Sequence, residues 1–265
     1  TWWASEYSAG PSRLIAYHKE ALEYYRALAE ANIPVDMIGV DDDLSKYKLV
    51  IAPMMYMCKV GYDEKIRTYV QNGGHFVTTY FSGYVEDHDL VVTGGYPARL
   101  RDILGIWVEE SDAIEEGRSN HFQYEGEEYP ATVLCDLLHL EGAQAISAYE
   151  EDFYAGMPVL TRNQFGQGEA YYVATRSDHA FYRKYIRNLC GELEIAPVMQ
   201  TPDGVEATVR ENEKGSFLFI LNHREEPAEI TIPADGTDLI KNITYHAGES
   251  VTLASKDVII LKKIK

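Results

Sequence analysis

Three side chains on one stretch of the chain are of the types that form a nucleophilic relay. Ser82, Asp87 and His88 could act as nucleophile, orienting acid and general base in a hydrolase. A relay of this kind depends on geometry in space, and residues so close along one loop rarely reach that geometry. We therefore assign no catalytic residue to this stretch.

A second group of residues has the spacing of a metal chelate. His139 and Glu141 stand two positions apart and could project from one face of a strand, with Asp136 as a third ligand. In the alternative, the neighbouring leucines anchor the segment while His139 and Glu141 form hydrogen bonds within the domain or across an interface. We prefer the alternative, and we predict neither a metal site nor a cofactor.

Paired carboxylates are the groups that glycoside hydrolysis requires, one as acid and one as nucleophile across the scissile bond. The candidates all occur as runs of adjacent residues: Glu109-Glu110, Glu115-Glu116, Glu127-Glu128, Glu150-Glu151-Asp152 and Glu225-Glu226. Adjacent carboxylates cannot face each other across a sugar, and acidic runs are usually solvated surfaces. We therefore predict no catalytic glutamate among them.

The overall composition disfavours several classes of binding partner. The 265 residues carry a formal charge of -18, which disfavours nucleic acid because a phosphate backbone would be repelled. No apolar stretch is long enough for a membrane-spanning helix, so we expect no membrane partner. The glycines do not form a nucleotide-binding fingerprint. A neutral substrate or a protein partner fits better.

The three cysteines point to a reducing compartment. Cys58, Cys135 and Cys190 lie far apart and show no metal-binding or redox spacing. We interpret all three as small buried apolar residues, and we expect a cytoplasmic protein.

The elements that position these residues alternate between helix and strand over most of the chain. Ser12 is a plausible N-cap for the first helix. The periodicity of apolar residues predicts helices over residues 12–31, 62–71, 99–104 and 178–193. It predicts strands over residues 34–40, 47–55, 75–81, 106–113, 145–149, 158–163 and 169–175, with a loop over 115–128. This alternation is typical of an α/β protein with a flavodoxin-like, doubly wound parallel sheet.

The pattern changes after a linker at residues 197–204, which holds two prolines and an Asp-Gly turn. Short alternating runs separated by turn residues follow, and they predict a small antiparallel β-sandwich. We therefore expect two domains, residues 1–197 and 198–265.

Several separated motifs resemble those of family-42 glycoside hydrolases, the bacterial β-galactosidases. They are Thr1-Trp2-Trp3, Asn32-Ile33-Pro34-Val35, Tyr80-Phe81-Ser82-Gly83, Gly94-Gly95-Tyr96-Pro97, the run 132–143, Gly168-Glu169-Ala170-Tyr171-Tyr172 and Leu221-Asn222-His223. The resemblance implies the trimerisation domain and the C-terminal β domain of such an enzyme. It implies a homotrimer that hydrolyses terminal β-D-galactosides with retention and needs no organic cofactor.

The same resemblance implies that the chemistry lies elsewhere. In this family the two catalytic glutamates, and any structural zinc, lie on a (β/α)8 barrel that precedes the present region. The trimerisation domain is similar to class I glutamine amidotransferases, whose nucleophilic cysteine follows a buried strand. Tyr80 fills that position here, and a phenol with an unperturbed pKa near 10 is a poor substitute for a thiolate. The resemblance also places a first, central strand just before Thr1.

Aromatic residues on otherwise polar segments are more numerous than one core-facing side of a sheet requires. We expect some of them to line a subunit interface or to form a wall of a neighbouring active site: Trp2, Trp3, Tyr80, Phe81, Phe153 and Tyr154. The alternative for each is ordinary burial within the domain.

Two functions of different class remain. The favoured one is a non-catalytic oligomerisation portion of a β-galactosidase. The alternative is a stand-alone amidotransferase-like or carbohydrate-binding protein.

Overall fold

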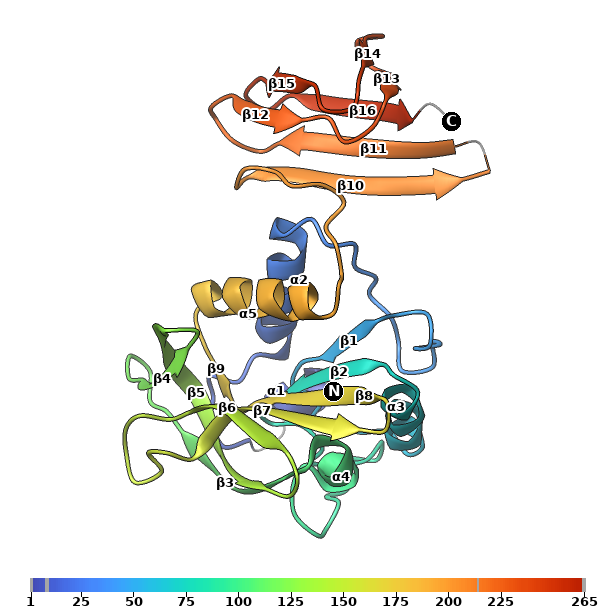
Figure 1. Ribbon diagram of the computed structural model, residues 1–265. Coiled ribbons are helices and arrows are strands. Elements are labelled where there is room, and N and C mark those ends of the chain that lie inside the picture. The colour runs from blue at the N-terminus through green and yellow to red at the C-terminus, as the bar shows by residue number, and fades with distance from the viewer. Residues whose placement is uncertain (1, 8–9, 214, 264–265) are drawn as a thin grey trace. The chain divides into compact units, whose positions relative to one another are not determined.

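The computed structural model describes residues 2–7, 10–213 and 215–263, and its chain path is shown in Figure 1. Thr1 and the Trp2 side chain lie outside the described part. The contacts divide the chain into two compact units. The larger unit contains residues 1–24 and 38–182, and the smaller unit contains residues 25–37 and 183–265.

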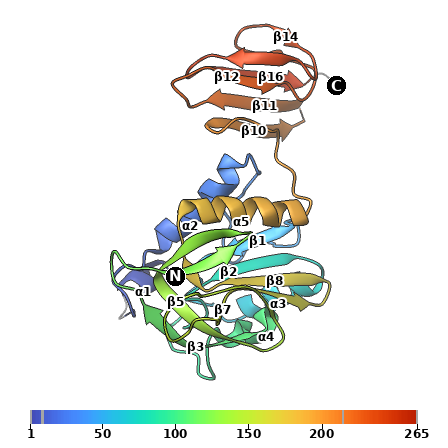
Figure 2. The same ribbon diagram turned by 60° about the vertical axis from the view of Figure 1, so that its left-hand side comes forward.

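A five-stranded mixed sheet forms the centre of the larger unit, and Figures 1 and 2 show its strands side by side. In sheet order the strands are β1 (Leu49–Ala52), β2 (His75–Thr79), β8 (Gly168–Val173), β7 (Pro158–Phe165) and β6 (Gln144–Ala148). Pairing is parallel from β1 to β8, but β7 and β6 are antiparallel. The expected all-parallel sheet is therefore wrong at these two strands, because nine residues connect β6 to β7 and two connect β7 to β8, whereas a parallel crossover needs about a dozen or more.

A second, antiparallel sheet was only partly anticipated. It contains β3 (Ile106–Ala113), β5 (Glu127–Leu140), β4 (Asn120–Tyr124) and the short β9 (Thr175–Arg176). The prediction of a loop over residues 115–128 is wrong, since β4 and β5 form a hairpin there. Its two turn residues, Glu125 and Gly126, have φ of 50° and 78°. Two positive φ values in a two-residue turn match the twist of the flanking strands.

The helices agree with the periodicity except near the N-terminus. They are α1 (Trp2–Tyr7), α2 (Tyr17–Glu30), α3 (Tyr62–Gln71), η1 (Ala98–Leu100), α4 (Arg101–Leu104) and α5 (His179–Glu192). Ser12 does not cap α2, which begins five residues later. Its hydroxyl instead accepts a 3.1 Å hydrogen bond from the Leu14 backbone N–H, which closes a local turn.

The predicted strand over residues 34–40 is absent, although its residues alternate as a strand would. It forms no ladder with any strand of the described chain, and Met37 is 76% exposed. β1 lies at the edge of its sheet, with β2 as its one neighbour. A strand is stabilised by a partner, so an alternating sequence without one remains irregular.

The smaller unit contains an antiparallel β-sandwich. One sheet has the order β10 (Val205–Asn212), β11 (Gly215–Asn222), β16 (Val258–Lys263), β13 (Gly236–Asp238) and β14 (Thr244–Tyr245). The other pairs β12 (Ala228–Thr231) with β15 (Ser250–Leu253). Inward-facing residues such as Leu218, Ile220 and Ile259 are fully buried and form its core.

Asn32 ties the helical part of this unit to the sandwich. Its side chain donates to Thr201 Oγ1 at 2.6 Å and accepts from the Ala207 backbone N–H at 2.8 Å. Its backbone carbonyl accepts from the Val198 N–H at 2.9 Å. These bonds satisfy groups at the start of the sandwich that would otherwise be buried without partners.

None of the helices in the described ranges is long and apolar enough to cross a membrane. The three cysteines are free and buried, as predicted.

Candidate functional site

The turn that follows β2, at the centre of the larger unit, has a strained backbone conformation. Phe81 has φ of 59°, which is an outlier for a bulky side chain and indicates that surrounding contacts hold it. Its ring is buried and stacks on Tyr56 at 4.8 Å between centroids. The strained position after the strand is therefore Phe81, one residue beyond Tyr80, and it carries an apolar ring.

A buried acid holds this turn from one side. Asp136, on β5, accepts hydrogen bonds from the Phe81 backbone N–H at 3.3 Å, from Ser111 Oγ at 2.6 Å and from the Tyr172 hydroxyl at 2.6 Å. Burial raises the pKa of Asp136 to about 6, while the bonds from Ser111, Tyr172 and Phe81 lower it. The carboxylate thus connects β5, β3, β8 and the turn.

A second buried acid lies on α2. Glu20 accepts hydrogen bonds from the hydroxyls of Tyr182 at 2.5 Å and Tyr80 at 3.1 Å, and Arg176 Nε lies 3.7 Å away. Complete burial raises the pKa of Glu20 to about 7, and the bonds from Tyr182 and Tyr80 and the charge of Arg176 oppose that rise. The phenol at the expected nucleophile position therefore serves as a donor to a buried carboxylate. Its own pKa lies well above 10 because burial disfavours the phenolate.

Sequence reasoning did not identify Glu20 as a site residue. The signal that could have found it is its place on α2, between Tyr17 and Tyr24 on the apolar stripe. A carboxylate on the buried face of a helix must have partners within the fold.

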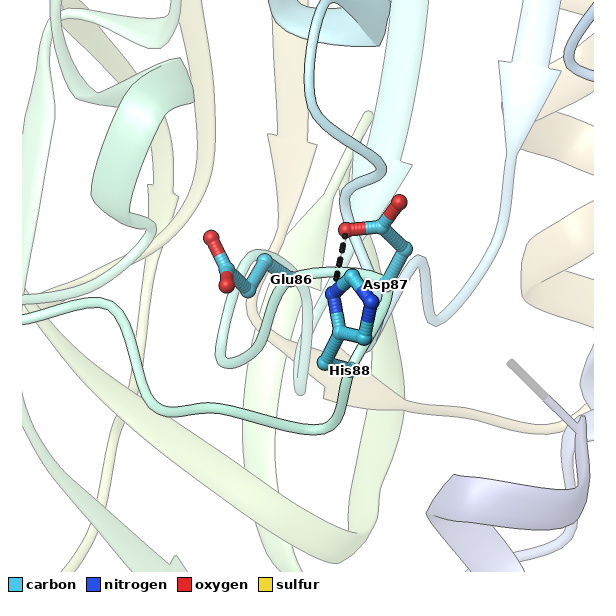
Figure 3. Close-up of side chains that lie close together, drawn as sticks. All are labelled: Glu86, Asp87 and His88. Carbon is cyan, nitrogen blue, oxygen red and sulfur yellow. Dashed lines mark ion pairs between the residues drawn. The ribbon is translucent and has the colours of Figure 1, made fainter.

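The residues of the possible serine relay do not form one. Ser82 is fully buried, and its hydroxyl bonds with Thr78 Oγ1 at 2.8 Å and accepts from the Met55 N–H at 2.9 Å. Asp87 and His88 lie on the loop beyond it and pair with each other at 3.4 Å (Figure 3). The serine proton is thus directed into the fold, away from the histidine.

The same loop holds a group of possible metal ligands. Glu86, Asp87 and His88 place ligand atoms within 4.8 Å of one another (Figure 3). Glu86 also pairs with Arg99 at 3.6 Å, and Asp87 and His88 are exposed. An exposed acidic group of this kind is common without an ion, and we assign no metal to it.

His139, on β5, and Glu141, just after β5, also have partners within the domain. His139 pairs with Glu109 at 2.5 Å and stacks on Trp107 at 4.9 Å, while Glu141 pairs with Arg101. Asp136 is buried in the network described above. The three residues are therefore not a ligand set, and the preferred alternative of hydrogen bonding is confirmed for His139 and Glu141.

The acidic runs are exposed along their whole length, as expected of solvated surfaces. Among the aromatic residues expected at an interface, Trp3 and Phe153 are each 75% exposed. Tyr80, Phe81 and Tyr154 are buried inside the chain, which favours the alternative of a core role for these three.

The family is decided by the match of a sequence model described as the β-galactosidase trimerisation domain, which covers residues 1–196. The chain belongs to the family of β-galactosidases that contain this domain. Residues 204–263 match a second model, described as the β-galactosidase C-terminal domain. The resemblance to family-42 β-galactosidases is therefore confirmed.

Individual β-galactosidases are similar over almost the whole chain. The β-galactosidase BgaA of Planococcus sp. (strain 'SOS Orange') is 44% identical over an alignment of 269 positions, which covers 99% of this chain and 39% of that protein. The crystal structure of the β-galactosidase from Bacillus circulans sp. alkalophilus has a TM-score of 0.95 at 43% identity, over 99% of this chain and 40% of that one. The Halorubrum lacusprofundi β-galactosidase, at 17% identity and a TM-score of 0.84, shares the fold. The chain thus spans about two fifths of the length of these relatives.

Proposed function

We propose that this chain is the trimerisation and C-terminal portion of a β-galactosidase and takes no direct part in bond cleavage. The observation that carries the proposal is the trimerisation-domain match over residues 1–196. In the intact protein, hydrolysis of terminal non-reducing β-D-galactosides with retention would use carboxylates outside this chain. Every acidic run of this chain is exposed, which supports the proposal that the catalytic carboxylates lie outside it.

The proposed partner is a second and third copy of the same chain. Trp3 and Phe153 present large apolar side chains to solvent, and such residues are enriched in the buried centres of protein interfaces. A homotrimer would cover them. In the same proposal, part of this surface closes off a neighbouring active site.

The proposed fold type is flavodoxin-like and close to class I glutamine amidotransferases, with the domain division at residue 197. The parallel β1, β2 and β8 and the strained turn after β2 support it. Tyr80 fills the position where a nucleophile would stand, and its hydroxyl donates to the buried carboxylate of Glu20. The scaffold would therefore be kept without amidotransferase chemistry. The buried free thiols of Cys58, Cys135 and Cys190 support a cytoplasmic location, and the similarity to Planococcus β-galactosidase supports a bacterial source.

Sedimentation velocity of the purified polypeptide tests the oligomeric role. We expect trimers in reversible exchange with monomers, and we expect Phe153→Asp to shift the population toward monomer. Leu239→Asp is the matched control, because Leu239 is also exposed, at 52%, but lies in the smaller unit. A strict monomer at high concentration, or equal effects of the two substitutions, would contradict the proposed interface.

An activity assay tests the non-catalytic role separately. We expect no nitrophenol release from nitrophenyl β-galactoside by this polypeptide. Turnover that is lost on changing a glutamate of the acidic runs would contradict the proposal. The alternative of a stand-alone carbohydrate-binding protein is favoured by one observation, the cavity described next.

A further inference from the structure

The larger unit contains an open cavity. Its volume is about 360 Å³, within the range of small-molecule sites. It is lined by three residues of β3 together with a glycine, a proline and two tyrosines: Gly10, Pro11, Tyr84, Tyr96, Glu109, Glu110 and Ser111. The lining contains two tyrosines, two glutamates and a serine, and none of its described residues is basic.

A β-bulge brings both carboxylates to the cavity. Successive side chains of a regular strand point to opposite faces, so adjacent glutamates on β3 would normally diverge. The pairing of β3 with β5 shifts register between Val108 and Glu110, and such a bulge redirects the side chains beside it. The Val108 N–H also donates to the Tyr96 carbonyl at 2.8 Å, which holds the aromatic wall against the bulge.

The aromatic wall is held rigid. Tyr84 and Tyr96 stack with centroids 3.8 Å apart and an interplanar angle of 12°. Phe81, on the strained turn, also packs against Tyr84, with ring centroids 4.7 Å apart. Tyr96 is therefore the outer, half-buried ring of a supported stack, and its orientation is fixed before any ligand arrives.

Hydrogen bonds between hydroxyl groups determine which groups of the wall can donate and which can accept. The Ser111 hydroxyl donates its single proton to the buried carboxylate of Asp136, so it cannot donate to a second group. The 2.8 Å contact between Tyr84 and Ser111 must then be a bond donated by Tyr84. The Tyr84 oxygen keeps its capacity to accept, and it lies in a wall that also holds the acceptor Glu110.

The available groups select a class of ligand. Among the described residues, the Glu110 carboxylate has no hydrogen-bond or ion-pair partner, while the Glu109 carboxylate pairs with His139. Acceptors outnumber donors, and no cation lines the cavity to hold an anion. A ligand that matches would carry several hydroxyl donors and one apolar face for the Tyr96 ring. The acidic pair alone would be an ordinary solvated surface.

We propose that this cavity binds a neutral pyranose sugar, with its C–H face on Tyr96 and its hydroxyls donating to Glu110 and Tyr84. Sugars have both features, a ring face of C–H groups and hydroxyls at the rim. The assignment stands on this cavity's geometry and does not depend on trimer formation.

Saturation-transfer NMR on the full polypeptide with methyl β-D-galactopyranoside tests the assignment. We expect saturable binding with Kd in the millimolar range, and the strongest transfer to ring C–H protons on one face. Tyr96→Ala, which removes the platform, and Glu110→Gln, which removes the unpaired charge and keeps the shape, should each weaken binding about tenfold.

Tyr25→Ala is the matched control, because it removes a partly exposed tyrosine from the smaller unit and should leave Kd unchanged. Glu110 is exposed, so its variant should fold even if Tyr96→Ala does not. Absence of saturable sugar binding would overturn the proposal. So would equal binding by wild type and Glu110→Gln, or displacement of the sugar by choline at lower concentration, which would identify a cation site.

Discussion

The Tyr182 hydroxyl donates a 2.5 Å hydrogen bond to the fully buried carboxylate of Glu20, 162 positions earlier in the chain. Tyr80 donates to the other oxygen of the same carboxylate. These two hydrogen bonds therefore join α2, the turn after β2 and α5 at one titratable group.

We expect this group to make stability depend on pH. The pKa of Glu20 is raised from 4.5 to about 7 on folding, so the folded state binds the proton more tightly. The resulting stabilisation is complete below about pH 4.5 and is lost as the pH rises through 7. Glu20→Gln cannot titrate, so the difference in unfolding free energy between variant and wild type should change by on the order of 3 kcal/mol across this window.

Urea unfolding at several pH values measures this difference. Asp136 contributes a slope of the same sign in both proteins and cancels in the comparison. Glu110→Gln makes the same substitution at an exposed position and serves as the control. Parallel profiles for wild type and Glu20→Gln would show that folding does not shift the pKa of Glu20.

A glycine at the start of β8 has no room for a side chain. A Cβ on Gly168 would lie 2.1 Å from the Gly74 carbonyl oxygen and 2.5 Å from that of Val70, both backbone atoms that cannot turn away. We expect Gly168→Ala to destabilise the larger unit by about 3 kcal/mol through backbone strain. Gly191→Ala, in α5 with nothing within 4 Å, should instead stabilise by about 0.5 to 1 kcal/mol. Thermal unfolding would test both, and similar melting temperatures would contradict the clash.

The side-chain hydrogen bonds of Asn32 predict a difference in stability between two asparagine variants. Asn32→Ala removes the side-chain bonds to Thr201 and Ala207 and should destabilise the smaller unit by about 2 kcal/mol. Asn242→Ala is the matched control, because Asn242 has φ of 55° against 54° for Asn32 but is exposed. The backbone strain added by alanine is therefore the same in both. Equal losses in chemical denaturation would mean that the bonds of Asn32 contribute nothing.

The sequence by itself determined the elements whose signals are local. The helix over 62–71 and the strand over 106–113 have the predicted bounds, because their apolar periodicity and flanking turn residues lie within one short window. The family was determined in the same way, since its motifs can be read directly from the chain.

Tertiary structure decided whatever depends on a distant partner. Residues 34–40 alternate like a strand, yet no described strand pairs with them, and alternation alone cannot supply that pairing. The direction of β6 and β7 was set by their short connections, and the function of Tyr80 was set by a carboxylate 60 positions away. The bulge that turns Glu109 and Glu110 into one cavity depends on the register of β3 against β5. Register, pairing and burial are properties of two segments in contact, so they have no signature in either segment alone.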